Sequence, residues 1–139
     1  MVIRIDGSDR EELIRRAFQA RELFYAPYSG YAVGAALLTA EGKIYSGCNI
    51  ENAAYGPTNC AERTAFFKAV SEGERHFKAI AIAGGPAGKV PTEYAYPCGV
   101  CRQVMSEFCD KDFLVILAKA EADYEVYSLE ELLPKSFSL

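Results

Sequence analysis

Two short cysteine segments constrain what this chain can fold into more than any other feature. Cys60 is followed two residues later by Glu62, while Cys98 and Cys101 form a C-x-x-C pair directly after Pro97. Three thiolates that converge on a zinc ion leave one of its four tetrahedral positions open, and a catalytic water occupies such a position. The fold therefore has to bring the two segments together, and their residues favour zinc-assisted hydrolysis.

The residues beside Cys60 fit a role in the same chemistry. A carboxylate next to a metal-held water is a general base, so Glu62 is the candidate proton carrier. Both segments fall at predicted helix N-termini, where free N–H groups and the positive end of the helix dipole favour thiolates. Arg63 is a candidate to hydrogen-bond a ligand sulfur and to offset part of the thiolate charge.

Other interpretations of the cysteines stay open at this point. A lone C-x-x-C pair also fits a redox site, although no thioredoxin-like β-α-β pattern precedes it. A closed structural zinc site needs a fourth ligand, for which Cys48, Cys109 and His76 are available, and the chain would then be a zinc-stapled binding domain without catalysis. Cys48 and Cys109 are otherwise expected to be buried small hydrophobic residues.

Length and charge narrow the class of protein. With 139 residues, half of them hydrophobic, we expect one domain spanning residues 1–139. The formal net charge of -4 and the absence of a basic cluster argue against nucleic acid as a partner and favour a small molecule.

Residues 1–6 lack a signal-peptide pattern, and no apolar run approaches the ~20 residues that span a membrane. Five cysteines favour metal ligands or buried thiols over disulfides, so we expect a cytoplasmic protein that does not bind membranes.

Hydrophobic periodicity and turn residues predict alternating helices and strands, in an order that places helices on both faces of a sheet. Residues 8–11 and 128–131 each have the capping-box pattern of a helix start. The predicted helices cover 9–25, 60–72, a segment from 98 onward and a short segment from 128 to Pro134, and the predicted strands cover 31–39, 43–47, 78–83, 113–118 and 125–127. The glycine- and proline-rich residues 84–96 are predicted to be a connecting loop.

Asn49 and Glu51 stand out in the polar stretch that follows the strand predicted over 43–47. Their alternate positions place both side chains on the same side of an extended chain. Polar residues at strand ends commonly face a site, so both are candidates for substrate contacts. The same residue types also form ordinary turns.

Several longer stretches of the sequence resemble one known family. C-A-E at 60–62 and P-C-G-V-C-R-Q at 97–103 resemble the zinc deaminase signature. Further matching stretches are A-P-Y-S-G-Y-A-V-G-A-A-L-L (26–38), G-C-N-I-E-N-A-A-Y-G (47–56), K-A-V-S-E-G (68–73) and E-E-L-L-P-K-S-F (130–137). Together they cover nearly the whole chain and resemble the cytidine deaminases of the small homotetrameric, three-cysteine zinc type. Within this resemblance, N-I-E-N-A-A-Y distinguishes nucleoside deaminases from their relatives.

This resemblance implies a fold, a metal site and a set of substrate contacts. The implied fold is α/β, a three-layer α/β/α sandwich around a five-stranded mixed sheet. The implied metal site holds one zinc ion per subunit on Cys60, Cys98 and Cys101, with Glu62 as proton shuttle and Arg63 tempering the thiolate charge. The implied substrate contacts are Asn49 and Glu51 to the ribose hydroxyls, the main chain of Ala61 near the pyrimidine carbonyl, Tyr31 in the base pocket, and Tyr55 and Phe137 reaching into a neighbouring subunit of a homotetramer.

The activity that the resemblance implies is hydrolytic deamination of cytidine and 2′-deoxycytidine to uridine and 2′-deoxyuridine, a pyrimidine-salvage reaction that releases ammonia. Deamination of an aminopyrimidine antibiotic such as blasticidin S is the alternative within the class, and the acidic composition disfavours polynucleotide editing. Three residues depart from the family's usual pattern. Tyr31 replaces phenylalanine, Val100 replaces alanine, and Pro57 precedes the predicted zinc helix.

Overall fold

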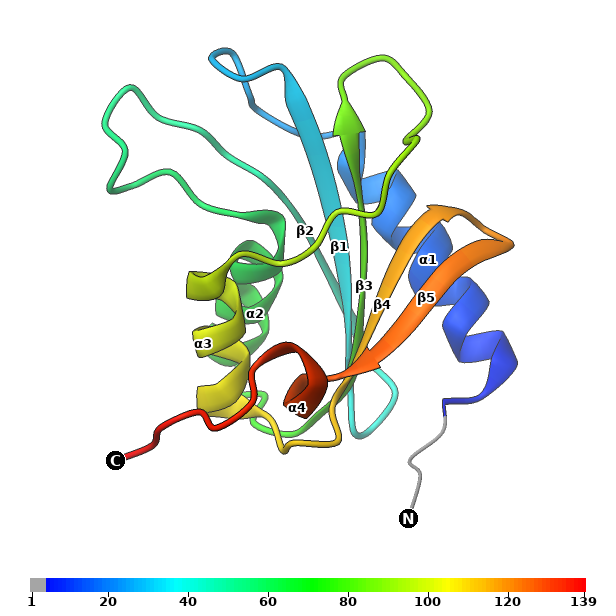
Figure 1. Cartoon of the computed structure of the whole chain (residues 1–139), viewed down its shortest axis with the longest axis vertical. Coiled ribbons are helices and arrows are strands. Elements are labelled where there is room, and N and C mark those ends of the chain that lie inside the picture. Colours follow the sequence, from blue (N-terminus) through cyan, green and yellow to red (C-terminus); the bar gives the residue numbers. More distant parts are fainter. Residues whose placement is uncertain (1–4) are drawn as a thin grey trace.

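Five strands form one mixed sheet in the order β2-β1-β3-β4-β5, as a computed structural model that describes residues 5–139 shows (Figure 1). β3 and β4 are parallel, and every other neighbouring pair is antiparallel. The strands are β1 (Tyr31–Thr39), β2 (Ile44–Cys48), β3 (Phe77–Pro86), β4 (Leu114–Ala120) and β5 (Asp123–Ser128), and the helices are α1 (Gly7–Arg21), α2 (Ala61–Ser71), α3 (Gly99–Phe108) and α4 (Leu129–Leu132). The expected five-stranded mixed sheet is confirmed.

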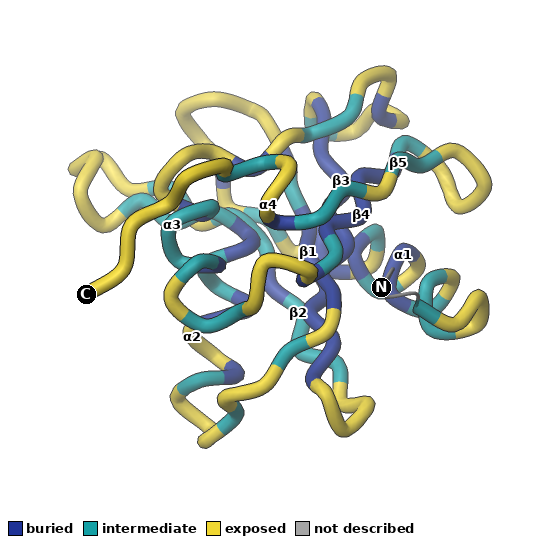
Figure 2. The backbone as a smooth tube through the Cα atoms, turned by 60° about the horizontal axis from the view of Figure 1, so that its bottom comes forward, coloured by how far each residue is buried: buried dark blue, intermediate teal, exposed yellow. Residues whose placement is uncertain are grey.

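Alternating side chains of the central strands build a separate core on each face of the sheet. Successive residues of a strand point to opposite faces. Ala35 and Leu37 of β1 pack in one core with Phe66 of α2, whereas Ala36 and Leu38 pack in the other core with residues of α1. α1 thus covers one face and α2, α3 and α4 cover the other, with the buried strands between them (Figures 1 and 2). The three-layer α/β/α arrangement is therefore confirmed.

Two glycines let helices approach the sheet more closely than any side chain would allow. A Cβ atom on Gly34 of β1 would lie 2.0 Å from the carbonyl oxygen of Ala17 in α1. On the other face, a Cβ atom on Gly47 of β2 would lie 2.6 Å from the amide nitrogen of Ala65 in α2. Because α2 starts directly after Cys60, the approach at Gly47 also sets where that cysteine lies.

α2 and α3 begin at the two cysteine segments, as predicted. Cys60 and Cys98 are the N-cap residues, with extended backbone and no hydrogen bond from the side chain to the helix end. Their thiols are therefore available for another partner. The predicted stop of α2 is confirmed as well, since Gly73 follows it with a φ of 100°, a conformation that favours glycine.

The first helix differs from the prediction at both ends. Asp6 caps α1 by accepting a hydrogen bond of 2.7 Å from the amide of Ser8, so the capping box predicted at residues 8–11 is wrong. The helix also ends one turn earlier than predicted. The reason is that the main chain of Tyr25 pairs with residues 49–51 through N–H···O bonds of 3.0 and 2.8 Å, which helical geometry would not permit.

β3 continues through residues that were predicted to be loop. Gly84, Gly85 and Pro86 extend the strand because they pair with the first residues of β1, and the prediction that it ends at residue 83 is wrong. Gly84 is required there because a Cβ atom would lie 2.9 Å from the side chain of Ala95, which crosses over the strand. The other strands agree with the prediction to within two residues, and the capping box at residues 128–131 is confirmed.

One buried arginine connects α1 to the end of β3 and to the loop that follows it. The guanidinium of Arg21, only 7% exposed, donates to the carbonyl oxygens of Ala32, Gly85, Pro86 and Lys89 at 2.9–3.1 Å. A buried cation is tolerated when its donors are satisfied in this way, and the C-terminal end of α1 adds favourable carbonyl dipoles. The side chain of Arg21 therefore holds the start of the long loop through main-chain carbonyl groups of the loop and of the strand before it.

No helix within residues 5–139 combines the length and the apolar composition needed to cross a bilayer. The expectation that residues 1–6 carry no signal pattern concerns a segment whose first four residues lie outside the described part of the chain.

The substitution Gly34→Ala tests the close approach of α1. The new methyl group would meet main-chain atoms that cannot rotate away, so we expect the free energy of unfolding to fall by about 3 kcal/mol, the upper end of the usual cost of overpacking. Gly7→Ala is the matched control, because its Cβ atom would approach only the flexible side chain of Arg10, at 3.8 Å. Urea unfolding of the two zinc-loaded proteins measures both effects, and equal midpoints would contradict the close approach.

Candidate active site and metal centre

The three cysteines of the two segments form one cluster. The sulfur atoms of Cys60, Cys98 and Cys101 all lie within 4.8 Å of one another. Cys60 Sγ and Cys98 Sγ are 3.8 Å apart, and Cys98 Sγ and Cys101 Sγ are 3.5 Å apart. Two sulfurs that each lie ~2.3 Å from a tetrahedral zinc ion are themselves ~3.8 Å apart, so the spacing fits zinc.

The local electrostatics favour the thiolate form that a metal requires. Cys60 and Cys98 cap α2 and α3, so free main-chain N–H groups and two helix dipoles face the sulfurs. The neighbouring Cys101 thiol, and a hydrogen bond from Nη2 of Arg63 at 3.2 Å, lower the pKa of Cys60 to about 5. The contact with Cys60 and burial raise the pKa of the Cys101 thiol.

The described residues supply no fourth protein ligand. Within residues 5–139, no further His, Cys, Asp or Glu joins the three-cysteine group. Cys48 donates its thiol hydrogen to the carbonyl of Leu23 instead. Cys109 packs against the core on the α2 side, where burial raises the pKa of its thiol, and His76 is exposed. None of the three candidates for a closed structural site therefore reaches the cluster.

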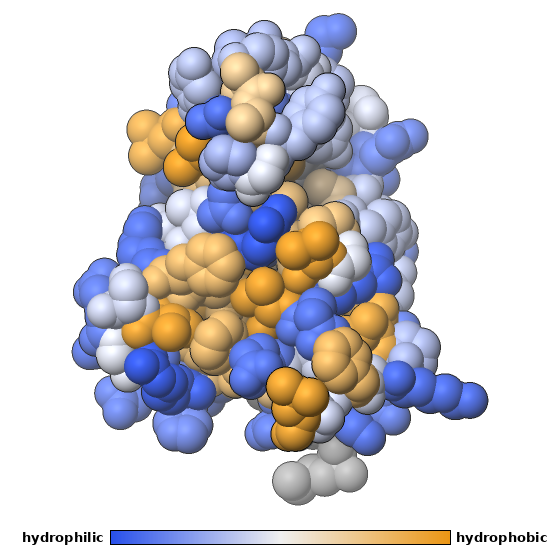
Figure 3. All heavy atoms as spheres, turned by 90° about the vertical axis from the view of Figure 1, so that its left-hand side faces the viewer, coloured by the Kyte–Doolittle hydropathy of each residue, from blue (hydrophilic) through white to orange (hydrophobic). Residues whose placement is uncertain are grey.

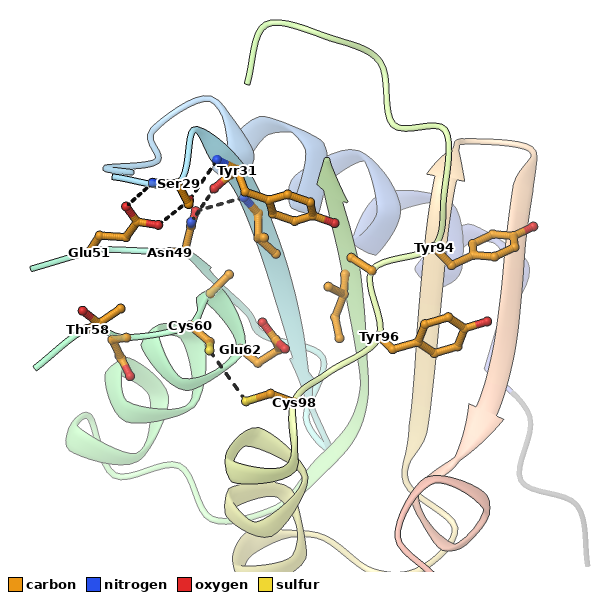
Figure 4. A pocket seen from close by; sticks show the side chains of 15 residues that line it. Ser29, Tyr31, Asn49, Glu51, Thr58, Cys60, Glu62, Tyr94, Tyr96 and Cys98 are labelled. Atoms are coloured by element: carbon orange, nitrogen blue, oxygen red, sulfur yellow. Dashed lines mark hydrogen bonds between the residues drawn. The ribbon is translucent and has the colours of Figure 1, made fainter. Parts of the chain in front are cut away.

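Glu62 lies beside the cluster at a cavity of about 320 Å³ (Figure 4). The cavity is lined by Cys60, Cys98 and Glu62 together with Ser29, Tyr31, Val33, Asn49, Glu51, Thr58, Asn59, Ala61, Ile82, Tyr94, Ala95 and Tyr96. Glu62 is only 5% exposed, and this burial, with the nearby Cys60 thiolate, raises the pKa of its carboxyl to about 7. A buried titratable carboxyl group and three sulfurs suited to bind a metal thus meet in one place.

Asn49 and Glu51 reach the same cavity from the segment after β2. Asn49 accepts a hydrogen bond from the amide of Val33 at 2.9 Å and donates one to the carbonyl of Tyr31 at 2.7 Å, so its side chain continues the pairing of β1 where β2 has ended. Glu51 accepts hydrogen bonds from the turn before β1. The two side chains are therefore held in place by main-chain groups.

The remaining predicted site residues divide into two groups. Tyr31 and Ala61 line the cavity, and Arg63 lies behind it, on the sulfur of Cys60. Tyr55 is 94% exposed and Phe137 67% exposed, and neither lines the cavity of its own chain. Of the three departures from the family pattern, only Tyr31 lines the cavity, whereas Val100 and Pro57 do not.

The sequence-based prediction missed one wall of the cavity. Tyr94, Ala95 and Tyr96 belong to the loop after β3, which was interpreted only as a connection. The hydroxyl groups of Tyr94 and Tyr96 donate to Asp123 and Glu125 of β5, and their rings lie over the sheet beyond the cavity (Figure 4). The signal available in the sequence was their position just before the ligand segment at residue 98. Ser29, Thr58 and Asn59 also line the cavity, and no role was predicted for them from the sequence.

Comparisons with known proteins agree with this geometry. A family model described as the cytidine and deoxycytidylate deaminase zinc-binding region matches residues 7–117. A cytidine deaminase from Sporosarcina psychrophila is 53% identical over 130 residues, which cover 94% of this chain and 92% of the relative. A cytidine deaminase from Halalkalibacterium halodurans is 52% identical over 130 residues, covering 94% and 95% of the two chains.

The crystal structure of a cytidine deaminase from Burkholderia pseudomallei has the same fold, with a TM-score of 0.83 at 48% identity, and the match covers 91% of this chain and 97% of that one. The family match includes all three clustered cysteines, and the zinc named in the family description fits their spacing. The chain belongs to the cytidine and deoxycytidylate deaminase zinc-binding family.

Proposed function

We propose that this protein hydrolyses cytidine and 2′-deoxycytidine to uridine and 2′-deoxyuridine, with release of ammonia. The observation that carries the proposal is that Cys60, Cys98 and Glu62 share one cavity with Asn49 and Glu51 (Figure 4). A hydrolytic centre and two polar groups suited to sugar hydroxyls therefore face the same ligand. A volume of about 320 Å³ lies within the range of small-molecule sites.

The metal would be held by Cys60, Cys98 and Cys101. When bound, zinc supplies a Lewis acid that makes a coordinated water reactive near neutral pH. Arg63 contributes by placing a cation on the sulfur of Cys60, at 3.2 Å, so that the three thiolates donate less negative charge to the site.

Glu62 moves the protons of the reaction. In the proposed sequence it accepts a proton from the attacking water and delivers it to ring N3, which makes C4 electron-poor while the water oxygen adds to C4. It then transfers the second proton of that water to the amino group. The C4–N bond breaks with its electron pair on nitrogen, and ammonia leaves. The burial of Glu62 supports this role because bulk water cannot exchange these protons.

The other cavity residues orient the nucleoside. Asn49 and Glu51 are proposed to bind ribose hydroxyls, the main chain of Ala61 to lie near the pyrimidine carbonyl, and the ring of Tyr31 to line the base pocket. All four line the cavity, and they come from three segments, namely the start of β1, the segment after β2 and the start of α2. A ligand that spans both ends would fix C4 against the metal centre and Glu62, which lowers the entropic part of the barrier.

We propose further that the protein is a homotetramer in which neighbouring subunits complete each site. Tyr55 and Phe137 are exposed in a single chain, although both are large and apolar. Apolar side chains also gather on the face formed by α2 and α3 (Figure 3), where Phe67 is 48% and Val100 56% exposed. Association through this face would bury surface that a monomer leaves in water.

The reaction would belong to pyrimidine salvage and take place in the cytoplasm. The support for this compartment is chemical. All five cysteines are free thiols, and three of them are arranged to bind a metal, which suits a reducing environment.

The decisive assay compares the wild type with Glu62→Gln on cytidine. We expect the wild type to release ammonia from cytidine and 2′-deoxycytidine, and far less from free cytosine, cytidine monophosphate or blasticidin S. Glu62→Gln keeps the size of the side chain but removes its acid and base function, so we expect kcat to fall about 10⁴-fold with zinc retained. Near-normal turnover by Glu62→Gln would contradict the proton route, and wild-type preference for blasticidin S would contradict the substrate.

Zinc content tests the assignment of the ligands. We expect one zinc ion per chain, lost on Cys98→Ala, because two remaining sulfurs hold the metal poorly. Cys48→Ser is the matched control, since the Cys48 thiol is bonded to the carbonyl of Leu23 and lies outside the cluster. Elemental analysis after dialysis gives the ratio of zinc to protein. Loss of zinc from Cys48→Ser would indicate a closed site with a different ligand set.

Removal of residues 137–139 tests whether the sites are shared. We expect a tetrameric mass in solution for the full chain, and a KM for cytidine that rises about tenfold in the truncated protein, because Phe137 no longer packs on a neighbour's substrate. Removal of residues 138–139 alone keeps Phe137 and serves as the control. A fully active monomer in either form would show that each chain builds its own site.

A further inference from the structure

The carboxylate of Glu51 is held by a single short turn. Its Oε1 atom accepts hydrogen bonds from the amides of Tyr28 at 3.0 Å and Ser29 at 3.1 Å. Its Oε2 atom accepts the hydroxyl hydrogen of Ser29 (Figure 4). All three donors come from two adjacent residues, so the position of this turn determines the position of the carboxylate.

The direction of the Ser29 hydrogen bond is fixed by a second contact. The amide of Tyr31 donates to the Ser29 hydroxyl oxygen at 3.0 Å, which leaves the single hydroxyl hydrogen for Glu51. Tyr31 is the first residue of β1, and its carbonyl in turn accepts from the side chain of Asn49 at 2.7 Å. The side chains of Asn49 and Glu51 are thus both held by residues at the start of β1 or in the turn before it.

These contacts leave one acceptor position on Glu51. A carboxylate offers about four lone-pair sites, two on each oxygen. Oε1 already accepts two hydrogen bonds and Oε2 accepts one, so a single site remains, on the oxygen that Ser29 contacts. The hydrogen bond from Ser29 is also the main cause that lowers the pKa of Glu51, which keeps it an acceptor at neutral pH.

We propose that Ser29 is a positioning residue for sugar recognition, which orients Oε2 of Glu51 to accept one hydroxyl group of the nucleoside. The inference rests on the proposed function, since it assigns the ligand at this end of the cavity. Ser29 lines the cavity beside Glu51, so its hydroxyl group is close to where the sugar would lie. The alternative is that Ser29 only stabilises the turn, in which case its loss affects every substrate alike.

The test is the kinetics of Ser29→Ala on cytidine and on its 2′-deoxy, 3′-deoxy and 5′-deoxy analogues. A lost hydrogen bond to a charged group reduces binding roughly tenfold, so we expect KM for cytidine to rise about tenfold with kcat nearly unchanged. For the analogue that lacks the recognised hydroxyl group, KM should be the same in Ser29→Ala as in the wild type. The insensitive analogue then identifies which hydroxyl Glu51 binds.

Two further variants make the test specific. Ser29→Thr retains the hydroxyl group and should restore most of the affinity for cytidine. If Ser29→Ala loses zinc or unfolds early in urea, Ser29→Cys keeps the size of the side chain with a weaker donor and is expected to show the same pattern to a smaller degree. An equal loss on all four nucleosides by an otherwise active enzyme would overturn the role of Ser29 alone. A wild type that deaminates none of them would overturn the proposed function as well.

Discussion

Negative charge gathered at one point is the constraint on which the rest of this structure depends. Three thiols within 4.8 Å of one another repel as they ionise, and the fold offsets this repulsion with main-chain dipoles. β3 and β4 are parallel, and α2 and α3 each run back toward the start of the strand that follows them, so the two helices point the same way (Figure 1). Their N-termini therefore meet, and Arg63 adds a full positive charge on one sulfur.

The same helix pair determines where Glu62, the proposed proton carrier, lies. Glu62 is in the first turn of α2, and the depth of this helix is set by the approach at Gly47 and by packing of Phe66 on Phe108 of α3, with ring centroids 6.3 Å apart. The polar groups at the other end of the cavity depend instead on the start of β1. Helices thus build the end of the cavity that holds the cysteine cluster and Glu62. A strand and the turn before it build the opposite end, which is proposed to recognise the sugar.

Features encoded by a few neighbouring residues could be predicted from the sequence. β1 was predicted at its observed bounds because its apolar run is uninterrupted, and the helix starts at Cys60 and Cys98 follow from local chemistry. The end of β3 was not predictable, since its glycines and proline form a strand only when β1 is beside them. Nor was the contribution of Ser29, because the partner that gives it a role, Glu51, is 22 positions away.

The loop after β3, which forms one wall of the cavity, is held by hydrogen bonds at both of its ends. Arg21 binds carbonyl oxygens at the end of β3 and one in the loop itself, that of Lys89. The hydroxyl groups of Tyr94 and Tyr96 attach the other end of the loop to β5. Neither set of hydrogen bonds involves the side chains of residues 87–90, which are mostly exposed. Except at Gly88, whose φ of 75° favours glycine, substitutions there leave the backbone path of the wall intact, so this segment can accumulate sequence variation. Such variation would change the outer surface of the molecule beside an unchanged metal centre, because residues 87–90 do not line the cavity.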